Sequence, residues 1–191
     1  KLIIINSPNN PTGKIYTKDE LREISQIIIK KAPNAVVLSD EVYEHIYYDN
    51  NISFPRIANE EGMWNRTLTL SSAGKIFSAT GVRIGWLIGD EDLIKATIPC
   101  HQYNTFCLYD PIQNLIADCL DQAENKYKGF DNYYLWYRDC YNQSRTHLFN
   151  YLVNVDTVFN TKEYKLNYFL PADLPAFLLI SSPMNRTPLP L

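Results

Sequence analysis

The sequence predicts an α/β fold with a mainly parallel sheet, and three neighbouring segments carry that prediction. Residues 1–6 and 35–39 are short apolar runs rich in β-branched residues, which is typical of strands buried on both faces. Between them, Thr17 is placed to cap a helix, with Glu20 three residues later to complete a capping box. Strand, helix and strand in this order form a βαβ unit, which joins two parallel strands.

The helix of this unit is expected to begin at Thr17 and to end near Pro33, because the residue before a proline disfavours helical conformation. Apolar residues recur along it at helical spacing, so one face is expected to pack on the sheet. That face would be formed by Leu21, Ile24, Ile27 and Ile28.

The rest of the chain continues to alternate between apolar runs and helical patterns, as an α/β fold requires. Two further strands are expected at residues 67–71 and 83–88. Helices are expected at residues 90–98, 111–122 and 133–152, and a last strand at residues 166–172.

The length of 191 residues is sufficient for one ordinary domain and part of a second. Composition shifts near Asn150, and the C-terminal end is rich in proline. We therefore expect one domain over residues 1–149 and a truncated segment of a second domain over residues 150–191.

Composition and charge exclude several classes of function. The formal net charge of −3 implies no basic face, which argues against a nucleic-acid partner. No apolar run approaches the length of a membrane span, so we expect no membrane partner. The four cysteines and three histidines show neither C-x-x-C nor H-E-x-x-H spacing, so we expect reduced thiols and no metal. Reduced thiols favour the cytoplasm, with a mitochondrial location as the alternative.

Polar residues follow the predicted strands at their carboxyl ends, where the functional groups of open α/β sheets gather. The segments concerned are residues 9–13, residues 40–43, residues 72–75 and the loop that reaches Arg83. Each of them alone is ordinary turn chemistry. Because they follow consecutive strands, together they predict one site at one edge of the sheet.

Residues 71–86 place two cations, Lys75 and Arg83, in an otherwise small, hydroxylated and apolar segment. A buried lysine near a second cation would be a nucleophilic amine that forms Schiff bases. Asp40 would be a buried carboxylate in need of a positive partner, and a protonated pyridine nitrogen provides one. Lysine and aspartate in this pairing are what pyridoxal 5'-phosphate (PLP) demands.

The remaining groups suit the other atoms of the same cofactor. Arg83 offers a fork of donors to the phosphate, and Ser72 can donate to it as well. Tyr43 and Asn10 are donors that could reach the ring hydroxyl. The two cations of residues 71–86 would therefore serve the two ends of one anionic cofactor.

Three segments, residues 6–14 (NSPNNPTGK), 39–44 (SDEVYE) and 71–86 (SSAGKIFSATGVRIGW), resemble the fold-type I, class I/II aminotransferases in order and spacing. The chain is most similar to the kynurenine aminotransferase and glutamine transaminase K group. A weaker similarity continues through His101, Gln102 and the helix at Pro111 to Tyr168 and Phe169. The resemblance implies a three-layer α/β/α PLP-binding large domain, present in part, with a stub of a small α+β domain.

The resemblance also implies a role for each residue already singled out. Lys75 would be the catalytic residue, which carries the internal aldimine and moves the proton between Cα and the cofactor. The other cofactor contacts would be Asp40 at the pyridine nitrogen, Asn10 and Tyr43 at the ring oxygen, and Ser72 and Arg83 at the phosphate.

The implied activity is transamination between an amino acid (kynurenine, glutamine or a large neutral one) and a 2-oxo acid, by a homodimer. Two alternatives stay open on the same scaffold. One is cysteine-S-conjugate β-lyase activity, and the other is an inactive, truncated paralogue that acts as an interaction module.

Some features of the family are missing or altered. Val82 stands where many relatives have an aromatic residue. The glycine-rich phosphate segment and the aromatic that stacks on the ring have no counterpart. Arg186 does not match the context of the family's substrate-carboxylate arginine, so it is not given that role. We therefore expect the chain to be a fragment of about half a relative.

Rival motifs fit less well. Ser72-x-x-Lys75 matches the S-x-x-K of β-lactamases, but neither S-D-N nor K-T-G occurs. A phosphate-binding P-loop would require a hydroxyl residue after Lys75, and Ile76 stands there.

Several conspicuous side chains are expected to be structural. Asp40 and Glu41 are adjacent on extended backbone and point opposite ways, so Glu41 is left out of the site. His45 and His101 are also left out of the catalytic set. Helical spacing indicates a packing role for Tyr133, Tyr134, Tyr137 and Tyr141.

Overall fold

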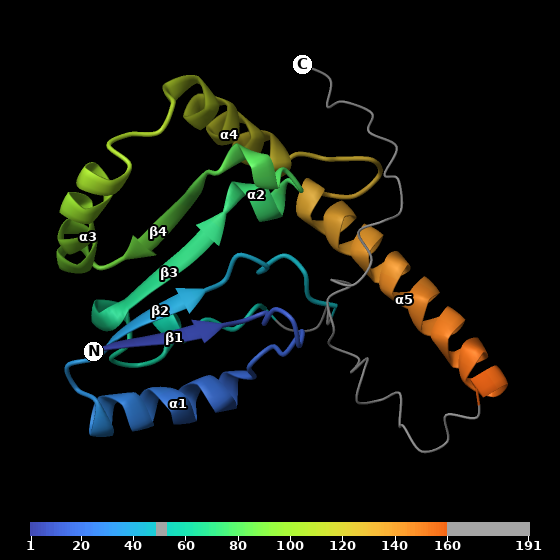
Figure 1. The fold of residues 1–191 in the computed structure, drawn as a ribbon, viewed down its shortest axis with the longest axis horizontal. Helices are drawn as coiled ribbons and strands as arrows, with labels where there is room; N and C mark the ends of the chain where they lie inside the picture. Colours follow the sequence, from blue (N-terminus) through green and yellow to red (C-terminus); the bar gives the residue numbers. More distant parts are fainter. Residues whose placement is uncertain (49–52, 160–191) are drawn as a thin grey trace.

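The computed structural model describes residues 1–48 and 53–159, which form a mixed sheet with helices around it (Figure 1). Its four strands run in the order β1-β2-β3-β4 across the sheet. The first three strands are parallel and β4 is antiparallel to β3. The strands are β1 (Leu2–Asn6), β2 (Val36–Asp40), β3 (Thr67–Ser72) and β4 (Gly85–Gly89). The predicted α/β class with a mainly parallel sheet is confirmed.

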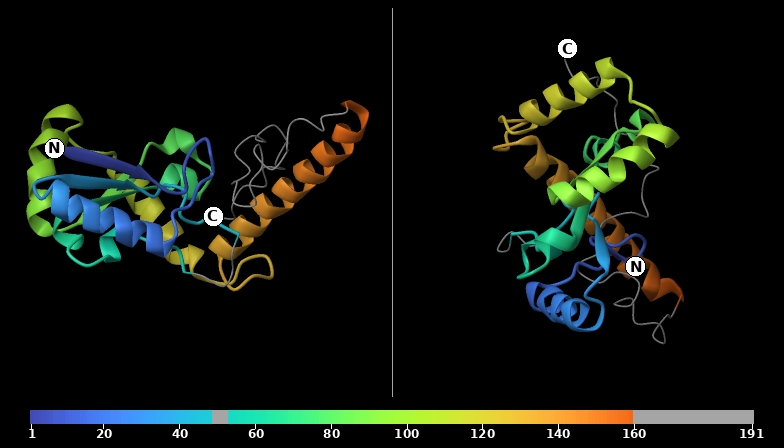
Figure 2. Two further views of the ribbon diagram at one scale, coloured as in Figure 1. Left: turned by 90° about the horizontal axis from the view of Figure 1, so that it is seen from below. Right: turned by 90° about the vertical axis from the view of Figure 1, so that its left-hand side faces the viewer.

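The α-helices of the described residues are α1 (Lys18–Lys31), α2 (Ala73–Ile76), α3 (Glu91–Asn104), α4 (Asp110–Ala123) and α5 (Tyr133–Phe159). Short 3-10 turns lie at Ile57–Asn59, Trp64–Arg66 and Thr80–Val82. Helix α5 extends away from the sheet, as Figure 1 and the left view of Figure 2 show.

Helix α1 begins with the predicted capping box. The Thr17 hydroxyl accepts the Glu20 N–H at 3.2 Å, and the Thr17 N–H donates to the Glu20 carboxylate at 2.7 Å. The helix ends at Lys31, shortly before Pro33. The unit β1–α1–β2 therefore forms as predicted, with β1 and β2 parallel neighbours.

One face of the sheet packs on α1 through a core of Ile5, Leu21, Ile28, Val37, Ile57 and Met63. The prediction was wrong for Ile27, which is 61% exposed. Ile27 lies about 120° from Leu21 around the helix axis, whereas Ser25 lies only about 40° from it. Ser25 is buried instead, and its hydroxyl donates to the Leu21 carbonyl at 2.7 Å.

The expectation that β1 is buried on both faces was wrong within the described residues. Ile5 faces the α1 core, but Leu2 and Ile4 on the opposite face are 61% and 63% exposed. Side chains alternate along a strand, so α1 can cover only one of the two faces.

Several element boundaries differ from those predicted. Helix α3 continues through Pro99 to Asn104, because a proline removes one ladder hydrogen bond and an exposed helix can satisfy that carbonyl with water. Strand β4 begins at Gly85, after Arg83 in a left-handed conformation. The single turn α2 was not predicted, since four residues carry no readable period.

The expected domain boundary near Asn150 falls within α5. The strand expected at residues 166–172 and Arg186 lie outside the described residues. Over the residues that are described, none of the helices has the length and hydropathy to cross a membrane. Nor does that part of the chain hold a group of side chains suited to a metal ion.

Candidate active site

One edge of the sheet collects the four predicted segments. The first three strands are parallel, so their carboxyl ends share this edge, and β4 starts here because it runs the other way. The register pairs Asn6 with Asp40 and Ser72 with Gly85. The predicted convergence at one edge of the sheet is therefore confirmed for the main chain.

Three of the predicted site residues, each from a different one of these segments, meet at this edge. The side-chain amide of Asn10 donates to the Tyr43 hydroxyl at 3.5 Å. The Lys75 ammonium lies 5.7 Å from the centre of the Tyr43 ring. Tyr43 itself is buried, so it forms a fixed floor between the other two residues.

Asn6, which sequence reasoning did not single out, ties these loops together. Its side-chain amide donates to the Asp40 carbonyl at 3.1 Å. Its side-chain oxygen accepts the Asn10 N–H at 2.9 Å and the Asn9 amide at 3.1 Å. An asparagine at the last position of a buried strand was the available signal, because its polar side chain requires partners there.

Asp40 ends β2 and is partly exposed rather than buried. One carboxylate oxygen accepts the Val42 N–H at 3.4 Å. Lys75 is also partly exposed, so the expected burial of both groups was wrong within the described residues. Neither forms a salt bridge among the described residues. Both lie at the edge of the sheet where the parallel strands end.

Glu41 has the structural role that was expected. Its side chain is 2% exposed and forms an ion pair with Arg56, and it accepts the Ser39 hydroxyl at 2.8 Å. Arg56 also pairs with Glu44, which accepts the Ser71 hydroxyl at 3.0 Å. These side-chain contacts fix the loop that follows Asp40, and they do so on the buried side of the sheet.

The ionisation of this buried pair reflects two opposing effects. Burial raises the pKa of Glu41 above its ordinary value, although the Arg56 guanidinium acts to lower it. Burial alone would lower the pKa of Arg56, but its contacts with Glu44 and Glu41 outweigh this and raise it.

Ser72 and Arg83 are neighbours at the start of α2. The Ala73 N–H donates to the Ile84 carbonyl at 3.1 Å. Ala73 follows Ser72 and Ile84 follows Arg83, so this hydrogen bond joins the main chain beside the two residues. Arg83 is exposed, and its φ of 57° is a backbone angle that residues other than glycine rarely adopt. Gly85 makes the approach possible, because a Cβ there would lie 2.8 Å from the Ser71 carbonyl oxygen.

The tyrosines of α5 pack as predicted, and two of them do more. Tyr137 lies in a core with Tyr43 and Ile46. Its hydroxyl also donates to the Lys75 carbonyl at 2.8 Å, and the Tyr133 hydroxyl donates to the Ile76 carbonyl at 3.1 Å. These contacts join residues more than fifty positions apart, so no local pattern announced them.

The two histidines left out of the site lie elsewhere. His45 stacks on Tyr134 with ring centres 4.1 Å apart. Burial, the largest effect, and the charges of Arg138 and Arg56 lower the pKa of His45 to about 4. His101 is exposed on α3.

Comparison with known proteins matches this fold and its motifs. The family model "Aminotransferase class I and II" matches residues 1–177. A kynurenine–oxoglutarate transaminase of Dictyostelium discoideum is 47% identical over 126 residues, which are 66% of this chain and 29% of that protein. Kynurenine–oxoglutarate transaminase 1 of Rattus norvegicus is 33% identical over 177 residues, which are 93% of this chain and 41% of that protein.

Solved structures give the same result. N-Succinyldiaminopimelate aminotransferase from Mycobacterium tuberculosis matches with a TM-score of 0.72 and 35% identity, over 81% of this chain and 38% of that one. Bna3p, a putative kynurenine aminotransferase from Saccharomyces cerevisiae, matches with a TM-score of 0.64 and 37% identity, over 75% and 32%. The chain thus spans less than half the length of these relatives. Since the family model matches nearly the whole chain, the chain belongs to the class I and II aminotransferases.

Proposed function

We propose that the whole protein is a PLP-dependent aminotransferase, which moves an amino group from an amino acid to a 2-oxo acid. Kynurenine and 2-oxoglutarate are the first substrates to test, because they stand in the names of the relatives. The observation that carries the proposal is the meeting of Asn10, Tyr43 and Lys75 at the edge where Asp40 ends its strand.

The donor set at this edge fits PLP, which offers an aldehyde, a ring oxygen, a ring nitrogen and a phosphate. The edge presents a primary amine, hydrogen-bond donors, a carboxylate and a guanidinium. None of Lys75, Asp40 and Arg83 is engaged in a salt bridge with another described residue, so each has capacity for a ligand. When bound, PLP withdraws electrons and so lets the Cα–H bond of an amino acid break.

Lys75 and Asp40 have complementary tasks in this proposal. The Lys75 amine would hold the aldehyde end of the cofactor and, once released, would take up and return the proton of the substrate Cα. The Asp40 carboxylate would favour a proton on the ring nitrogen by its negative charge. The Val42 N–H and the hydrogen bond of Asn6 to the Asp40 carbonyl fix the direction of this carboxylate.

The other residues orient the ring. Tyr43 and Asn10 lie within hydrogen-bond reach of each other, so both can donate to a single oxygen atom. The main chain next to Ser72 pairs with the main chain next to Arg83, and the hydroxyl and guanidinium of these two residues suit a phosphate dianion. Holding Arg83 in a left-handed conformation costs about 1 kcal/mol.

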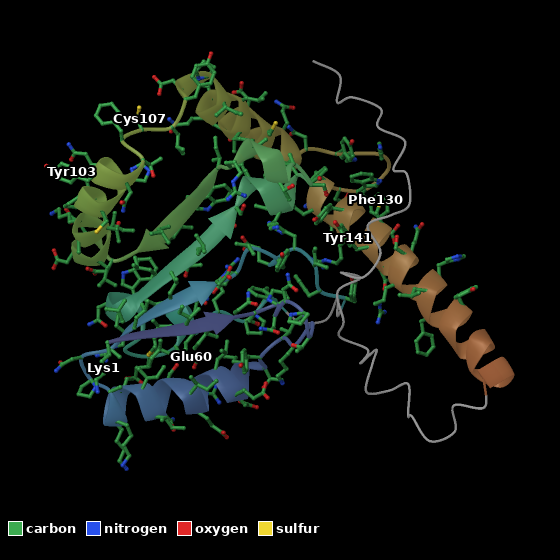
Figure 3. All side chains as sticks on the ribbon, viewed as in Figure 1. Lys1, Glu60, Tyr103, Cys107, Phe130 and Tyr141 are labelled. Atoms are coloured by element: carbon green, nitrogen blue, oxygen red, sulfur yellow. The ribbon has the colours of Figure 1, made fainter. Side chains whose placement is uncertain are left out.

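We also propose that the whole protein is a homodimer. Three large aromatic side chains, Tyr103, Phe106 and Tyr109, are 86%, 75% and 74% exposed at the end of α3 and in the loop that leads to α4. Figure 3 shows Tyr103 and Cys107 at the rim of the molecule, on the side away from α5. An apolar surface of this kind is typical of a subunit interface, and light scattering of the whole protein tests it.

Two further assignments belong to this proposal. Residues 1–149 would belong to the PLP-binding large domain and residues 150–191 to the small domain, in keeping with a family match that continues to residue 177. The cysteines of the described chain are free thiols, which favours the cytoplasm over an oxidising compartment.

The direct test is to supply the whole protein with PLP, kynurenine and 2-oxoglutarate and to measure glutamate. We expect glutamate to form, and Lys75→Ala to abolish its formation while the circular dichroism spectrum is retained. Lys95→Ala is the matched control, because Lys95 is exposed and, within the described part of the chain, pairs only with Glu91 on the surface of α3.

Two results would contradict the proposal. Pyruvate and ammonia from a cysteine conjugate, without glutamate, would indicate the β-lyase. A protein that stays colourless in excess PLP and forms no product would indicate an interaction module.

A further inference from the structure

Lys75 lies on helix α2, which is too short to fix its own orientation without contacts from neighbouring elements. Helix α2 is one turn of four residues, and a single turn is not stable by itself in water. At its start, the Ala73 N–H donates to the Ile84 carbonyl at 3.1 Å. Any precision in the direction of the Lys75 side chain must come from such contacts with neighbouring elements.

The end of α2 is closed by a Schellman motif. The Ala79 N–H donates to the Gly74 carbonyl at 2.9 Å, and the Ser78 N–H donates to the Lys75 carbonyl at 3.3 Å. Ser78 adopts the left-handed conformation, with a φ of 51°, that glycine usually supplies at this position. The motif is therefore less favourable than one with glycine, so the end of α2 gains from a further stabilising contact.

Helix α5 provides that support. Tyr137 and Tyr133 are four residues apart and so share one face of α5, and their rings stack with centres 5.7 Å apart. Their hydroxyls donate to the carbonyls of Lys75 at 2.8 Å and of Ile76 at 3.1 Å. Burial raises the pKa of both tyrosines, so both remain protonated donors at neutral pH.

Tyr137 also contacts the other side of the site. Only 4% of it is exposed, and its ring packs in one core with Tyr43, the residue that Asn10 and Lys75 both approach. A single side chain thus donates a hydrogen bond to the main chain of Lys75 and shares a core with the ring that the Lys75 amine approaches.

We propose that Tyr137, with Tyr133 in a supporting part, is a positioning residue for Lys75. Its hydroxyl fixes the carbonyl of Lys75 while its ring fixes Tyr43, so the Lys75 amine is held in reach of the cofactor aldehyde. This inference rests on the proposed function, because it assumes that the Lys75 amine reacts with PLP.

The test uses substitutions that remove a hydroxyl and keep the ring. Tyr137→Phe and Tyr133→Phe remove the two hydrogen bonds to α2. Tyr134→Phe is the matched control, because Tyr134 lies on the same helix and stacks on His45, and within the described residues its hydroxyl makes no hydrogen bond to α2. All variants are made in the whole protein and freed of PLP.

The first measurement is the rate at which added PLP becomes covalently attached at Lys75, followed by timed borohydride reduction and mass mapping of peptides. We expect Tyr137→Phe to slow attachment about fivefold and Tyr133→Phe about threefold, with Tyr134→Phe unchanged. A merely structural role would lower the melting temperature and leave the attachment rate of the folded protein unchanged.

The second measurement is hydrogen exchange of the apoprotein, which does not depend on cofactor chemistry. We expect faster exchange at the amides of Phe77, Ser78 and Ala79 in Tyr137→Phe, and no change there in Tyr134→Phe. Because the Tyr133→Phe variant alters only the weaker contact, it can be measured even if Tyr137→Phe folds poorly.

The outcomes separate this inference from the function on which it rests. If Lys75 is labelled at the same rate in all four proteins, the positioning role is wrong and the proposed function stands. If the unsubstituted protein carries no PLP at Lys75, the proposed function is wrong, and the inference is overturned with it.

Discussion

Two groups of charged residues lie near the end of β2. The residues of one group form ion pairs with one another, whereas those of the other group form none in the described chain. The internal cluster consists of Glu41, Glu44 and Arg56, and its members are paired with one another and with serine hydroxyls. The edge set consists of Asp40, Lys75 and Arg83, and no salt bridge to a described residue involves any of them. Asp40 and Glu41 are adjacent in sequence, so extended backbone alone sends one to each group.

The contrast separates charges that pair within the chain from charges that have no ionic partner in the described chain and that we propose bind the cofactor. A buried charge without a partner costs several kcal/mol, and the internal cluster avoids that cost within the chain. The edge set remains partly exposed and converges through the sheet register. We therefore expect substitutions in the internal cluster to change stability, and substitutions in the edge set to change chemistry.

Among substitutions that retain Lys75, the largest effect is expected for Asp40→Ala. Without this carboxylate, no other described residue is proposed to hold a proton on the ring nitrogen. The value of kcat should therefore fall about 1,000-fold at saturating PLP. The melting temperature should change little, because Asp40 has no ionic partner in the described chain. Steady-state kinetics and thermal unfolding check both parts. A variant that transaminates at the normal rate would remove Asp40 from the site.

The next effect is expected for Arg56→Met, which leaves Glu41 without its cation. Unfolding free energy should fall by about 3 kcal/mol, and protonation of Glu41 limits the loss. Below the melting temperature, PLP should still attach at Lys75. Urea unfolding measures the first quantity and peptide mapping the second. Unchanged stability together with lost PLP attachment would reverse the assignment of the two groups.

A smaller effect is expected from His45, which lies beside the internal cluster. Its pKa is lowered to about 4, so between pH 6.5 and 4 the unfolded chain binds a proton that the folded chain does not. Stability from this group is complete above pH 6.5 and is lost as the pH falls.

His45→Phe keeps a ring against Tyr134 and removes the titration. From pH 7 to pH 5 the unsubstituted protein should lose about 2 kcal/mol more stability than the variant. Urea unfolding at both pH values gives the difference, and the neighbouring carboxylates are common to both proteins. Equal losses would show that His45 titrates normally.

The smallest effect concerns the turn that carries Lys75. Ser78→Gly relieves the left-handed conformation but gives the unfolded chain more conformational freedom, so we expect a net gain of about 0.5 kcal/mol. Kinetic constants should stay the same, since the Schellman hydrogen bonds are made by the main chain. Chemical unfolding detects the gain, and a loss of stability would contradict it.

Much of the fold was predictable because it depends on local chemistry. The capping box of Thr17 and Glu20 and the β-branched runs are read from neighbouring residues. The errors arose where local patterns compete. Ile27 shared the apolar spacing but not the buried face, and Pro99 did not end an exposed helix.

Strand ends and resemblance proposed Asp40 and Lys75 as members of the candidate site, and parallel strands place the main chain of both segments at one edge of the sheet. The contacts that support the candidate site were not predicted. Arg56 as the partner of Glu41, and Tyr137 as the donor to the Lys75 carbonyl, could not be foreseen. Each joins residues that are far apart in sequence, and only packing decides which of many candidates meet.

The most direct test of the account is a crystal structure of the whole protein with PLP bound. The account predicts the pyridine ring between Lys75 and Asp40, with the Lys75 amine bonded to the aldehyde carbon and the Asp40 carboxylate within hydrogen-bond distance of the ring nitrogen. PLP bound at another place, or a ring nitrogen that points away from Asp40, would contradict it.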